Sequence, residues 1–377
     1  MKKIILCSFL LTSLLSRSQK VDLDRFYFDV SFQNLPTNIV PFEQRTFATT
    51  TITDGSIAAQ FDNAKILNND LNIDGWKKVN ENATVTVTLN LADFYEVGKK
   101  FETRTVEEKD KDGKVIRSYP MYTLVTTYQG KAYANLIKPN LEKAVVAVAP
   151  TTEVKSTNRF LKSTAQPTEN SESNVSTSQN SINFSESFTY KSSENVSQSV
   201  LEKEDRLNRV ANYNTRLRDY VKHVISGVNY NLNYNYGFSP VSFKEQLWIL
   251  DSKEEEGAIQ KEAIEAVKVQ FSQMKADESI DKLTADLQPL IEYFESLKTK
   301  YKEDNKGSKK IRYSAYYNLG KIYLYLDQPE KTIAEGEGLI ANDYDKGDGK
   351  DLVKAGNKLL DTFNKTLWRT RHNPSFN

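Results

Sequence analysis

The amino-acid sequence predicts an α+β protein of two domains, an N-terminal antiparallel β-sandwich-like domain and a C-terminal α-helical domain. Its 377 residues exceed what one compact core usually holds. Apolar residues alternate with a period of two as far as about Val148, and they recur every three or four residues after about Ser193. The predicted order is a signal peptide at 1–18, a β-rich domain at 19–150, a flexible linker at 151–185 and the helical domain at 186–377.

The first residues have the pattern of a secretory signal peptide. Lys2 and Lys3 precede an apolar stretch from residue 4 to residue 15, and two small residues, Ser16 and Ser18, follow it. We therefore expect an exported protein. Cleavage after Ser18 leaves Gln19 as the first residue, a start that resembles those of exported Bacteroidota proteins. The expected location is the periplasm or the outer membrane, with the cell exterior as a further option.

Export restricts the chemistry and the partners of the mature chain. The single cysteine, Cys7, lies inside the signal peptide, so the mature chain has no disulfide, thiol nucleophile or Cys-ligated metal. It keeps 48 basic against 50 acidic residues, without the basic excess that nucleic acid requires. Beyond the signal peptide, no apolar run approaches the roughly 20 residues of a membrane span. We expect neither nucleic-acid binding nor a transmembrane segment.

Strands are predicted throughout the β-rich domain. The segment 83–94 alternates valine and leucine with threonine, as a half-buried strand requires. Asp112 and Gly113 can form a tight hairpin turn, and Gln129 with Gly130 suggests a second reversal. These features favour antiparallel strands in a meander or sandwich.

The linker and the helices differ sharply in composition. Of the 33 residues at 151–183, 20 are Ser, Thr, Asn or Gln, too polar to offset the entropy of ordering. After them, a helix is predicted at 193–225 with apolar residues at three- and four-residue steps. The residues of this apolar stripe are Val196, Val200, Leu207, Val210, Leu217, Val221 and Val224. Further helices are predicted at 241–253, 258–275 and 277–303.

The stretch AYYNLGKIYLYLDQPEKTI, residues 315–333, resembles a tetratricopeptide repeat. The residues that match the spacing of the family's first helix are Tyr316, Leu319, Gly320 and Tyr323, and Pro329 stands where the second helix begins. The resemblance covers about 313–346. The second helix departs from the family, with Gly336 in place of an aromatic residue and Tyr344 in place of a proline.

A single repeat of this kind cannot bury its own apolar faces. We expect 258–275 with 277–303 to pack before it, and a helix at 349–366 to cap it. The resemblance implies a non-catalytic scaffold that holds an extended peptide or helix of another envelope protein. In the family's pattern the groove is lined by positions that correspond to Tyr317, Asn318, Lys321 and Tyr325. The alternative is that Tyr317 and Tyr325 only pack on a neighbouring helix.

Two other segments allow a functional and a structural interpretation. The acidic segment 342–351 could bind calcium, but from Asp343 the EF-hand order fails, and Asp345 or Asp348 could instead cap the last helix. The segment VNYNLNYNYGF, 228–238, could present tyrosines to a sugar or peptide, or it could be a connector whose rings are buried.

The sequence gives little support for catalysis. It holds only two histidines, His223 and His372, and no glycine-rich phosphate loop. We therefore expect no enzyme, no cofactor and no metal site. The expected function is protein–protein interaction through the tetratricopeptide-like domain. The alternative is binding of a glycan or small ligand by aromatic residues of the β domain.

Overall fold

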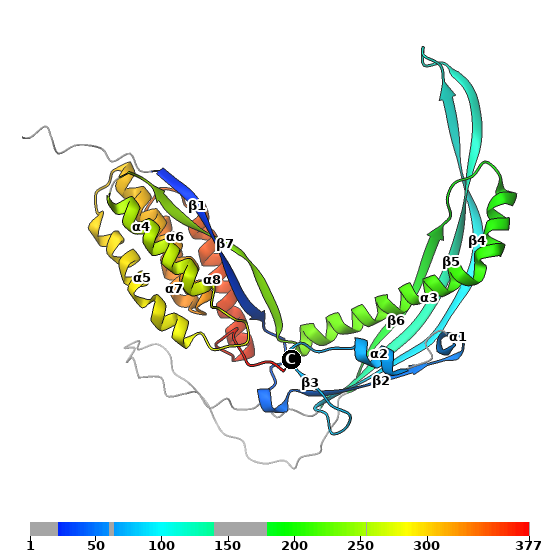
Figure 1. Ribbon diagram of the computed structural model, residues 1–377, viewed down its shortest axis with the longest axis horizontal. Helices are drawn as coiled ribbons and strands as arrows, with labels where there is room; N and C mark the ends of the chain where they lie inside the picture. Colours follow the sequence, from blue (N-terminus) through cyan, green and yellow to red (C-terminus); the bar gives the residue numbers. More distant parts are fainter. Residues whose placement is uncertain (1–21, 60–63, 139–178, 254, 377) are drawn as a thin grey trace, which may run out of the picture. The chain divides into compact units, whose positions relative to one another are not determined.

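A computed structural model describes residues 22–59, 64–138, 179–253 and 255–376 (Figure 1). These residues form two units with separate cores. The helical unit comprises the described part of Met1–Ile39 together with Tyr236–Phe376, and the sheet unit comprises Val40–Asn235. Both helices and strands are present, as an α+β protein requires. The signal peptide and most of the predicted linker lie outside the described residues.

The boundaries of the units differ from the predicted ones. The chain passes between units near residues 39 and 235, whereas the prediction placed the division at 151–185. The first strand belongs to the helical unit because it pairs with a strand more than 200 residues later. Residues 179–191 are a strand of the other unit. Long-range strand pairing leaves no mark in local composition, so the sequence pattern could not reveal this exchange.

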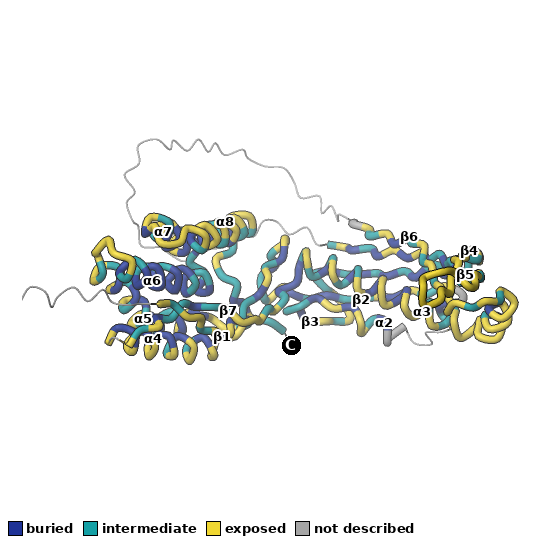
Figure 2. The backbone as a smooth tube through the Cα atoms, turned by 90° about the horizontal axis from the view of Figure 1, so that it is seen from above, coloured by how far each residue is buried: buried dark blue, intermediate teal, exposed yellow. Residues whose placement is uncertain are grey.

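Five helices of the helical unit stand side by side, each packed against the next in sequence (Figure 1). They are α4 (Glu255–Phe271), α5 (Asp281–Lys300), α6 (Lys306–Tyr325), α7 (Pro329–Ala341) and α8 (Gly347–Thr366). Helix α6 is buried along most of its length (Figure 2). Leu319 is fully buried in the main core, and Tyr316 packs on a second cluster. The predicted stacking of helical pairs around residues 313–346 is therefore present.

A two-stranded antiparallel ribbon lies across α4 and α6. It consists of β1 (Asp22–Asn34) and β7 (Ser239–Asp251), paired along their full length. The predicted helix at 241–253 is therefore wrong. Leu247 and Leu250 are buried against the helices while their neighbours are more exposed, and the pairing with β1 stabilises the extended form over a short helix.

Glycines set the spacing between α7 and α8. A Cβ atom on Gly336 would lie 2.8 Å from the carbonyl oxygen of Gly349, and one on Gly349 would lie 2.7 Å from Ile340 Cγ1. A Cβ on Gly320 would lie 2.7 Å from Leu352 of α8. The departure from the tetratricopeptide pattern at Gly336 therefore has a steric cause, because the backbones of α7 and α8 approach closely there.

The sheet unit has one mixed five-stranded sheet in the order β3-β2-β4-β5-β6. Its strands are β2 (Thr46–Thr53), β3 (Lys77–Lys78), β4 (Val85–Lys109), β5 (Val115–Ile137) and β6 (Gln179–Lys191). Strand β2 runs parallel to β3 and β4, and the other pairs are antiparallel. Three short helices, η1 (Phe42–Gln44), α1 (Gly55–Ala58) and α2 (Ala64–Asp70), precede β3. A single 39-residue helix, α3 (Gln198–Tyr236), lies along the sheet (Figure 1).

One of the two predicted reversals in this sheet is present. Gly113 has φ of +80° in the turn between β4 and β5, as the predicted hairpin requires. The reversal at Gln129 and Gly130 is wrong, because β5 continues through both residues. A Cβ on Gly130 would collide with the ring of Tyr220. This glycine admits an aromatic ring of α3 onto the sheet and marks no turn.

Helix α3 includes most of the Tyr-Asn segment, so the predicted connector at 228–238 is also wrong. The apparent alternation hides a four-residue period, V-N-Y-N-L-N-Y-N. Val228 and Leu232 are fully buried, one helical turn apart. The side chains of Asn229 and Asn233 both donate to and accept from the backbone at 70–74, with N···O distances of 2.7 to 3.2 Å. The asparagines thus attach the helix to the α2–β3 loop.

Only part of the predicted apolar stripe of this helix is buried. Leu217, Val221 and Val224 are in the core. Val196 precedes the helix and is exposed, as are Val200, Leu207 and Val210. In the first turns of the helix the sheet-facing apolar residue is Leu201 instead. The long helix contacts the sheet with different sides at its two ends, so a single stripe does not describe it.

Candidate functional site

The four residues predicted to line a partner groove lie together on α6, facing strand β7 of the same chain. Asn318 is fully buried, and Tyr317 and Tyr325 are 7% and 4% exposed. The fourth, Lys321, keeps a side-chain exposure of 18%. All four belong to the helical unit. The four residues therefore share one face of α6, and β7 of the same chain covers that face.

Asn318 holds β7 through two backbone hydrogen bonds at one residue. Its Oδ1 accepts from the N–H of Trp248 at 2.8 Å, and its Nδ2 donates to the carbonyl of the same residue at 2.7 Å. An amide side chain that pairs with both polar groups of one residue acts as a short piece of an adjoining strand. It satisfies groups of β7 that point away from β1, so the ribbon needs no third strand there.

The other three residues contact β7 on either side of this amide. Lys321 Nζ lies 3.0 Å from a carboxylate oxygen of Glu245, and the Tyr325 hydroxyl donates to the same carboxylate. The ring of Tyr317 packs edge-on against Trp248, with centroids 6.1 Å apart. Burial and the nearby Glu245 carboxylate raise the pKa of Tyr325 far above its ordinary value. The tyrosine stays a neutral donor, and the Asn318 amide, the Lys321 ammonium group and the Tyr325 hydroxyl are all engaged by β7.

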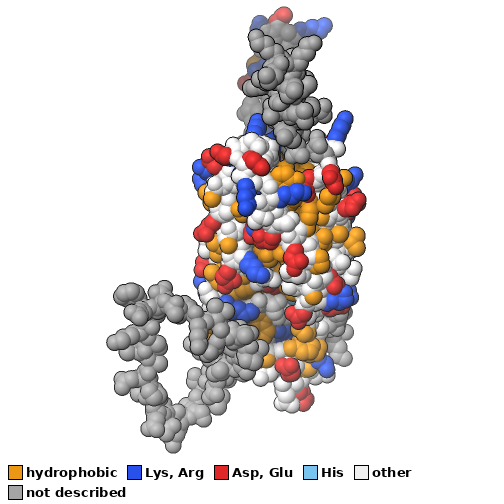
Figure 3. Space-filling model, turned by 90° about the vertical axis from the view of Figure 1, so that its left-hand side faces the viewer, with side chains coloured by type: hydrophobic (Ala, Val, Ile, Leu, Met, Phe, Trp, Pro, Cys, Tyr) orange, Lys and Arg blue, Asp and Glu red, His pale blue; other side chains and the backbone are white. Residues whose placement is uncertain are grey.

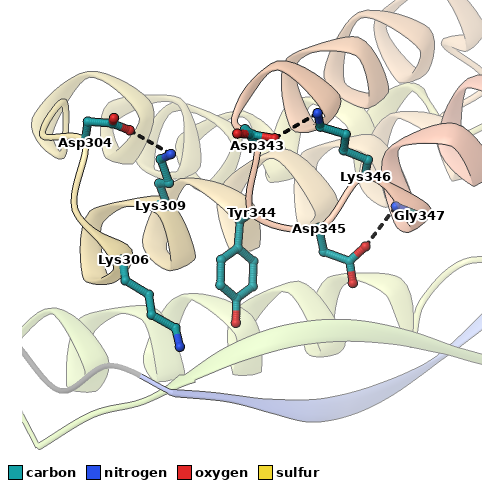
Figure 4. A pocket seen from close by; sticks show the side chains of 8 residues that line it. All are labelled: Asp304, Lys306, Lys309, Asp343, Tyr344, Asp345, Lys346 and Gly347. Atoms are coloured by element: carbon teal, nitrogen blue, oxygen red, sulfur yellow. Dashed lines mark hydrogen bonds and ion pairs between the residues drawn. The ribbon is translucent and has the colours of Figure 1, made fainter.

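In the acidic segment 342–351, aspartate side chains contact a lysine and a backbone N–H group of the same segment (Figure 4). Asp343 pairs with Lys346 at 2.8 Å, which lowers the pKa of the carboxyl group. Asp345 Oδ1 accepts from the backbone N–H of Gly347 at 2.8 Å, at the first residue of α8. Among the described residues, no group of three or more His, Cys, Asp or Glu side chains could hold a metal ion.

Asp348 in the same segment connects three elements. Its Oδ2 accepts from the hydroxyl of Tyr313 at 2.5 Å and from Trp248 Nε1 at 3.1 Å. These bonds join α8 to α6 and to β7. The calcium interpretation does not fit this arrangement, because the carboxylate is already engaged by two side-chain donors. The segment instead anchors the ribbon to the last helix.

A small cavity of about 200 Å³ lies between α3 and the sheet. Tyr128 of β5, Tyr190 of β6 and Leu201 of α3 are among the residues that line it. The full lining is Leu124, Thr126, Tyr128, Tyr190, Lys191, Ser192, Leu201, Glu204, Asp205, Asn208, Asn212 and Arg216. The volume is below the roughly 300 to 1,000 Å³ of sites for drug-sized ligands, so it suits one small molecule.

Polar groups of both kinds converge on this cavity. Glu204, Asn208, Asn212 and Arg216 follow one another at four-residue steps, so one side of α3 offers carboxylate, amide and guanidinium groups in order. The guanidinium of Arg216 lies 3.8 Å from the ring centroid of Tyr190. Two acidic and two basic residues line the cavity, which gives the lining no net formal charge. Such a surface can bind a neutral molecule rich in hydroxyl groups.

Sequence analysis missed this cavity, although a signal for it was present. The four-residue spacing of polar side chains at 204–216 is visible in the sequence. This spacing does not by itself indicate a binding site, because a polar stripe on a long helix usually faces solvent. Tyr128 and Tyr190 come from strands 62 residues apart and meet only through the pairing of β5 with β6. Burial raises the pKa of both tyrosines, so their hydroxyls are protonated donors.

The two histidines take no part in either set of residues. His223 on α3 lies 3.0 Å from the Glu186 carboxylate of β6, and about half of its side chain is exposed. His372 is buried at the C-terminal end of the helical unit, where Nδ1 contacts the carbonyl of Lys275 at 3.0 Å. They belong to different units.

Comparisons with known proteins assign the chain to no family. No model of a known protein family matches it, and no curated protein matches it significantly. None of the described helices combines the length and the apolar character needed to cross a membrane. On the face shown in Figure 3, acidic and basic side chains are interspersed, with hydrophobic side chains between them.

Proposed function

We propose that this protein is an exported, non-catalytic binding protein of the cell envelope, and that the cavity beside α3 binds a neutral sugar. The observation that carries the proposal is the lining of that cavity. Two tyrosine rings stand beside amide, hydroxyl and paired charged groups in a space that fits one small molecule. Sugars offer both donors and acceptors on their hydroxyls and apolar C–H faces to aromatic rings.

Because β7 covers the face of α6 that carries the predicted groove residues, we expect the ligand site to lie in the sheet unit instead. An external peptide at Tyr317 and Asn318 would have to replace β7, which is held there by two backbone hydrogen bonds and an ion pair. The sheet unit has no comparable occupant in its cavity among the described residues. The glycan alternative is therefore supported more directly than the groove.

Sugar binding is tested with the full exported chain and single variants of the lining. A panel of neutral monosaccharides is titrated by calorimetry and by saturation-transfer NMR. Asn212→Ala and Tyr190→Ala are expected to weaken binding about tenfold or more, because each removes polar or aromatic contacts to the ligand. Thr215→Ala, on an exposed part of the same helix, serves as the control.

Two results would contradict the sugar site. One is the absence of saturation transfer from the protein to every sugar in the panel. The other is binding that survives both cavity variants unchanged, since the ligand would then lie elsewhere. Unfolding curves of each variant show whether the fold is retained.

The second candidate function is a tetratricopeptide-like scaffold for another envelope protein. The specific observation in its favour is that α6 holds an extended strand by backbone hydrogen bonds, as the family holds extended peptides. In this hypothesis an incoming peptide displaces β7. Asn318→Ala weakens the hold on β7 and should increase recovery of a specific partner from envelope extracts. Equal or lower recovery than with the unmodified chain would argue against displacement.

A further inference from the structure

The strand edges of the sheet unit differ in how they are protected against pairing. Beyond Leu91, where β2 stops pairing, β4 carries nine charged residues among eighteen and register shifts at three places. The outer edge of β5 at 115–124 carries Pro120 and is tied to Asn195 through Tyr122. The β3 edge is two residues long. Charge, bulges, proline and shortness are the usual means of preventing edge-to-edge association.

Strand β6 has none of these protections along 13 residues. Its sequence, QNSINFSESFTYK, contains only two charged residues, Glu186 and Lys191, and neither proline nor glycine. It pairs with β5 from Gln179 to Lys191 without a register shift. No strand among the described residues pairs with its other edge. A regular, nearly uncharged edge of this length is a template for one more strand.

Exposed aromatic side chains lie on the same side of the unit as this edge. His223 and Gly227 of α3 contact β6, through Glu186 and Phe184 respectively. Tyr230 and Tyr234 follow them by two helical turns, so they continue the same side of the helix. Both are exposed, at 75% and 63%, and their rings stack with centroids 6.4 Å apart. Adjacent exposed aromatic rings are characteristic of interfaces.

We propose that β6 pairs with β6 of a second copy of this chain, in antiparallel register about Ser185, so that two sheets join into one. In that register, side chains on the α3 side of one β6 strand lie opposite side chains on the α3 side of the other. Ile182 lies opposite Phe188 of the second copy on the α3 side, and Asn183 lies opposite Ser187 on the other side. Only one acidic and one basic side chain per strand enter the interface, so charge repulsion is small.

The same register accounts for the exposed tyrosines. In an antiparallel pair the C-terminal part of the second strand, with Phe188 and Tyr190, runs beside the N-terminal part of the first. Along α3 the contacts run in the opposite direction to β6, from Tyr190 beside Arg216 to Phe184 beside Gly227. Tyr230 and Tyr234 therefore lie toward the N-terminal part of β6, where the aromatic end of the second strand arrives. This inference is independent of the sugar site.

The test is the oligomeric state of the exported chain in sedimentation equilibrium, from low to high micromolar concentration. The unmodified chain is expected to be a dimer. Ser187→Lys with Asn183→Lys places lysine opposite lysine twice in the pair and should weaken the dimer about tenfold or more. Ser187→Lys with Asn183→Glu places opposite charges at the same positions and should remain dimeric. Gln129→Lys, on β5 directly opposite Ser187 within one copy, is the control.

A second measurement does not depend on charge. The exported chain lacks cysteine, so Ser185→Cys adds a single thiol at the proposed two-fold axis. Mild oxidation should then give a covalent dimer, whereas Gln129→Cys should not. A monomeric unmodified chain at every concentration overturns the proposal, and so does equal dimerisation of the two charge variants. Folded Ser185→Cys protein that forms no covalent dimer overturns it as well.

Discussion

The two units differ in how accessible their candidate binding residues are to an external ligand. In the helical unit, the face that resembles a peptide groove is covered by β7, and its amide, lysine and tyrosine groups are all engaged by the chain itself. In the sheet unit, a polar cavity lies open beside α3, no described strand pairs with the outer edge of β6, and Tyr230 and Tyr234 are largely exposed. The difference shows that a strand of the same chain can occupy a helix face whose residue pattern resembles a peptide groove.

The comparison predicts that the same kind of substitution has different consequences in the two units. Helical-unit residues should affect stability, and sheet-unit residues should affect binding or association. Three pairs of variants, each with one member in either unit, test this division. They are ordered by the expected effect on the free energy of unfolding.

Gly336→Ala should destabilise the helical unit most, by about 3 kcal/mol. Its new Cβ would lie 2.8 Å from the Gly349 carbonyl oxygen and from Val353 Cγ2, so α8 would have to move. Gly98→Ala on β4 is the control, because no atom lies within 4 Å of its Cβ position. Denaturant unfolding followed by circular dichroism measures both. A Gly336→Ala loss no greater than that of the control would show that α7 and α8 can separate freely.

Asn318→Ala should cost about 2 to 4 kcal/mol, because it leaves the N–H and C=O of Trp248 without their partner in a buried place. Asn212→Ala, an exposed amide at the sheet-unit cavity, should change stability by no more than about 0.5 kcal/mol. Unfolding monitored by tryptophan fluorescence compares the two. Similar losses would remove the distinction between a closed face and an open cavity.

The features that the sequence predicts correctly are those set by residues close together in the chain. Local periodicity located the helices at 258–275, 277–303 and 349–366 to within a few residues, and the Asp112–Gly113 pair identified its hairpin. Asn318 and its neighbours were placed on one helix face for the same reason. A 3.6-residue period is a property of nearby residues, so it can be detected in the sequence without knowledge of the tertiary structure.

Most of the failures involve partners distant in sequence, whereas the helical period of the Tyr-Asn segment 228–238 is present in the sequence itself. Residues 241–253 form a strand because β1 pairs with them, and the α6 groove is closed by that same strand. The Gln129–Gly130 pair predicts a turn, but Gly130 accommodates the ring of Tyr220 of α3. In each case a local pattern permits two structures, and a contact across 70 to more than 200 residues selects one. The cavity beside α3 was missed for this reason too, since its two tyrosines come from different strands.

The stability of the helical unit should also depend on pH, through His372 and Glu335. Burial lowers the pKa of this imidazole below its ordinary value of about 6.5, despite the Lys275 carbonyl that favours the charged form. The unfolded chain therefore binds the proton first, and stability falls as pH drops below about 6.5 toward the folded-state pKa. Burial acts oppositely on Glu335, whose pKa rises to about 7 although Lys298 lies 3.0 Å away. Its contribution is lost as pH rises from about 4.5 to 7.

The His372 contribution is isolated by comparing the unmodified chain with His372→Asn. The difference in unfolding free energy between them should change with pH only in the acid range, below about 6.5. The Glu335 effect is common to both proteins and cancels. A difference that is constant across this range would show that the imidazole is not desolvated in the folded chain.

The smallest effect on stability is expected for Tyr230→Ser with Tyr234→Ser, at no more than about 0.5 kcal/mol, because both side chains are largely exposed. Tyr317→Ser is the counterpart in the helical unit and should cost several times more, since that ring is buried against Trp248. The same double variant should weaken association of two copies at β6, so its loss appears in sedimentation and not in unfolding of the single chain. If the double variant instead destabilised the fold as much as Tyr317→Ser does, Tyr230 and Tyr234 would contribute to folding. Their side chains would then be engaged within the sheet unit, as Tyr317 is within the helical unit.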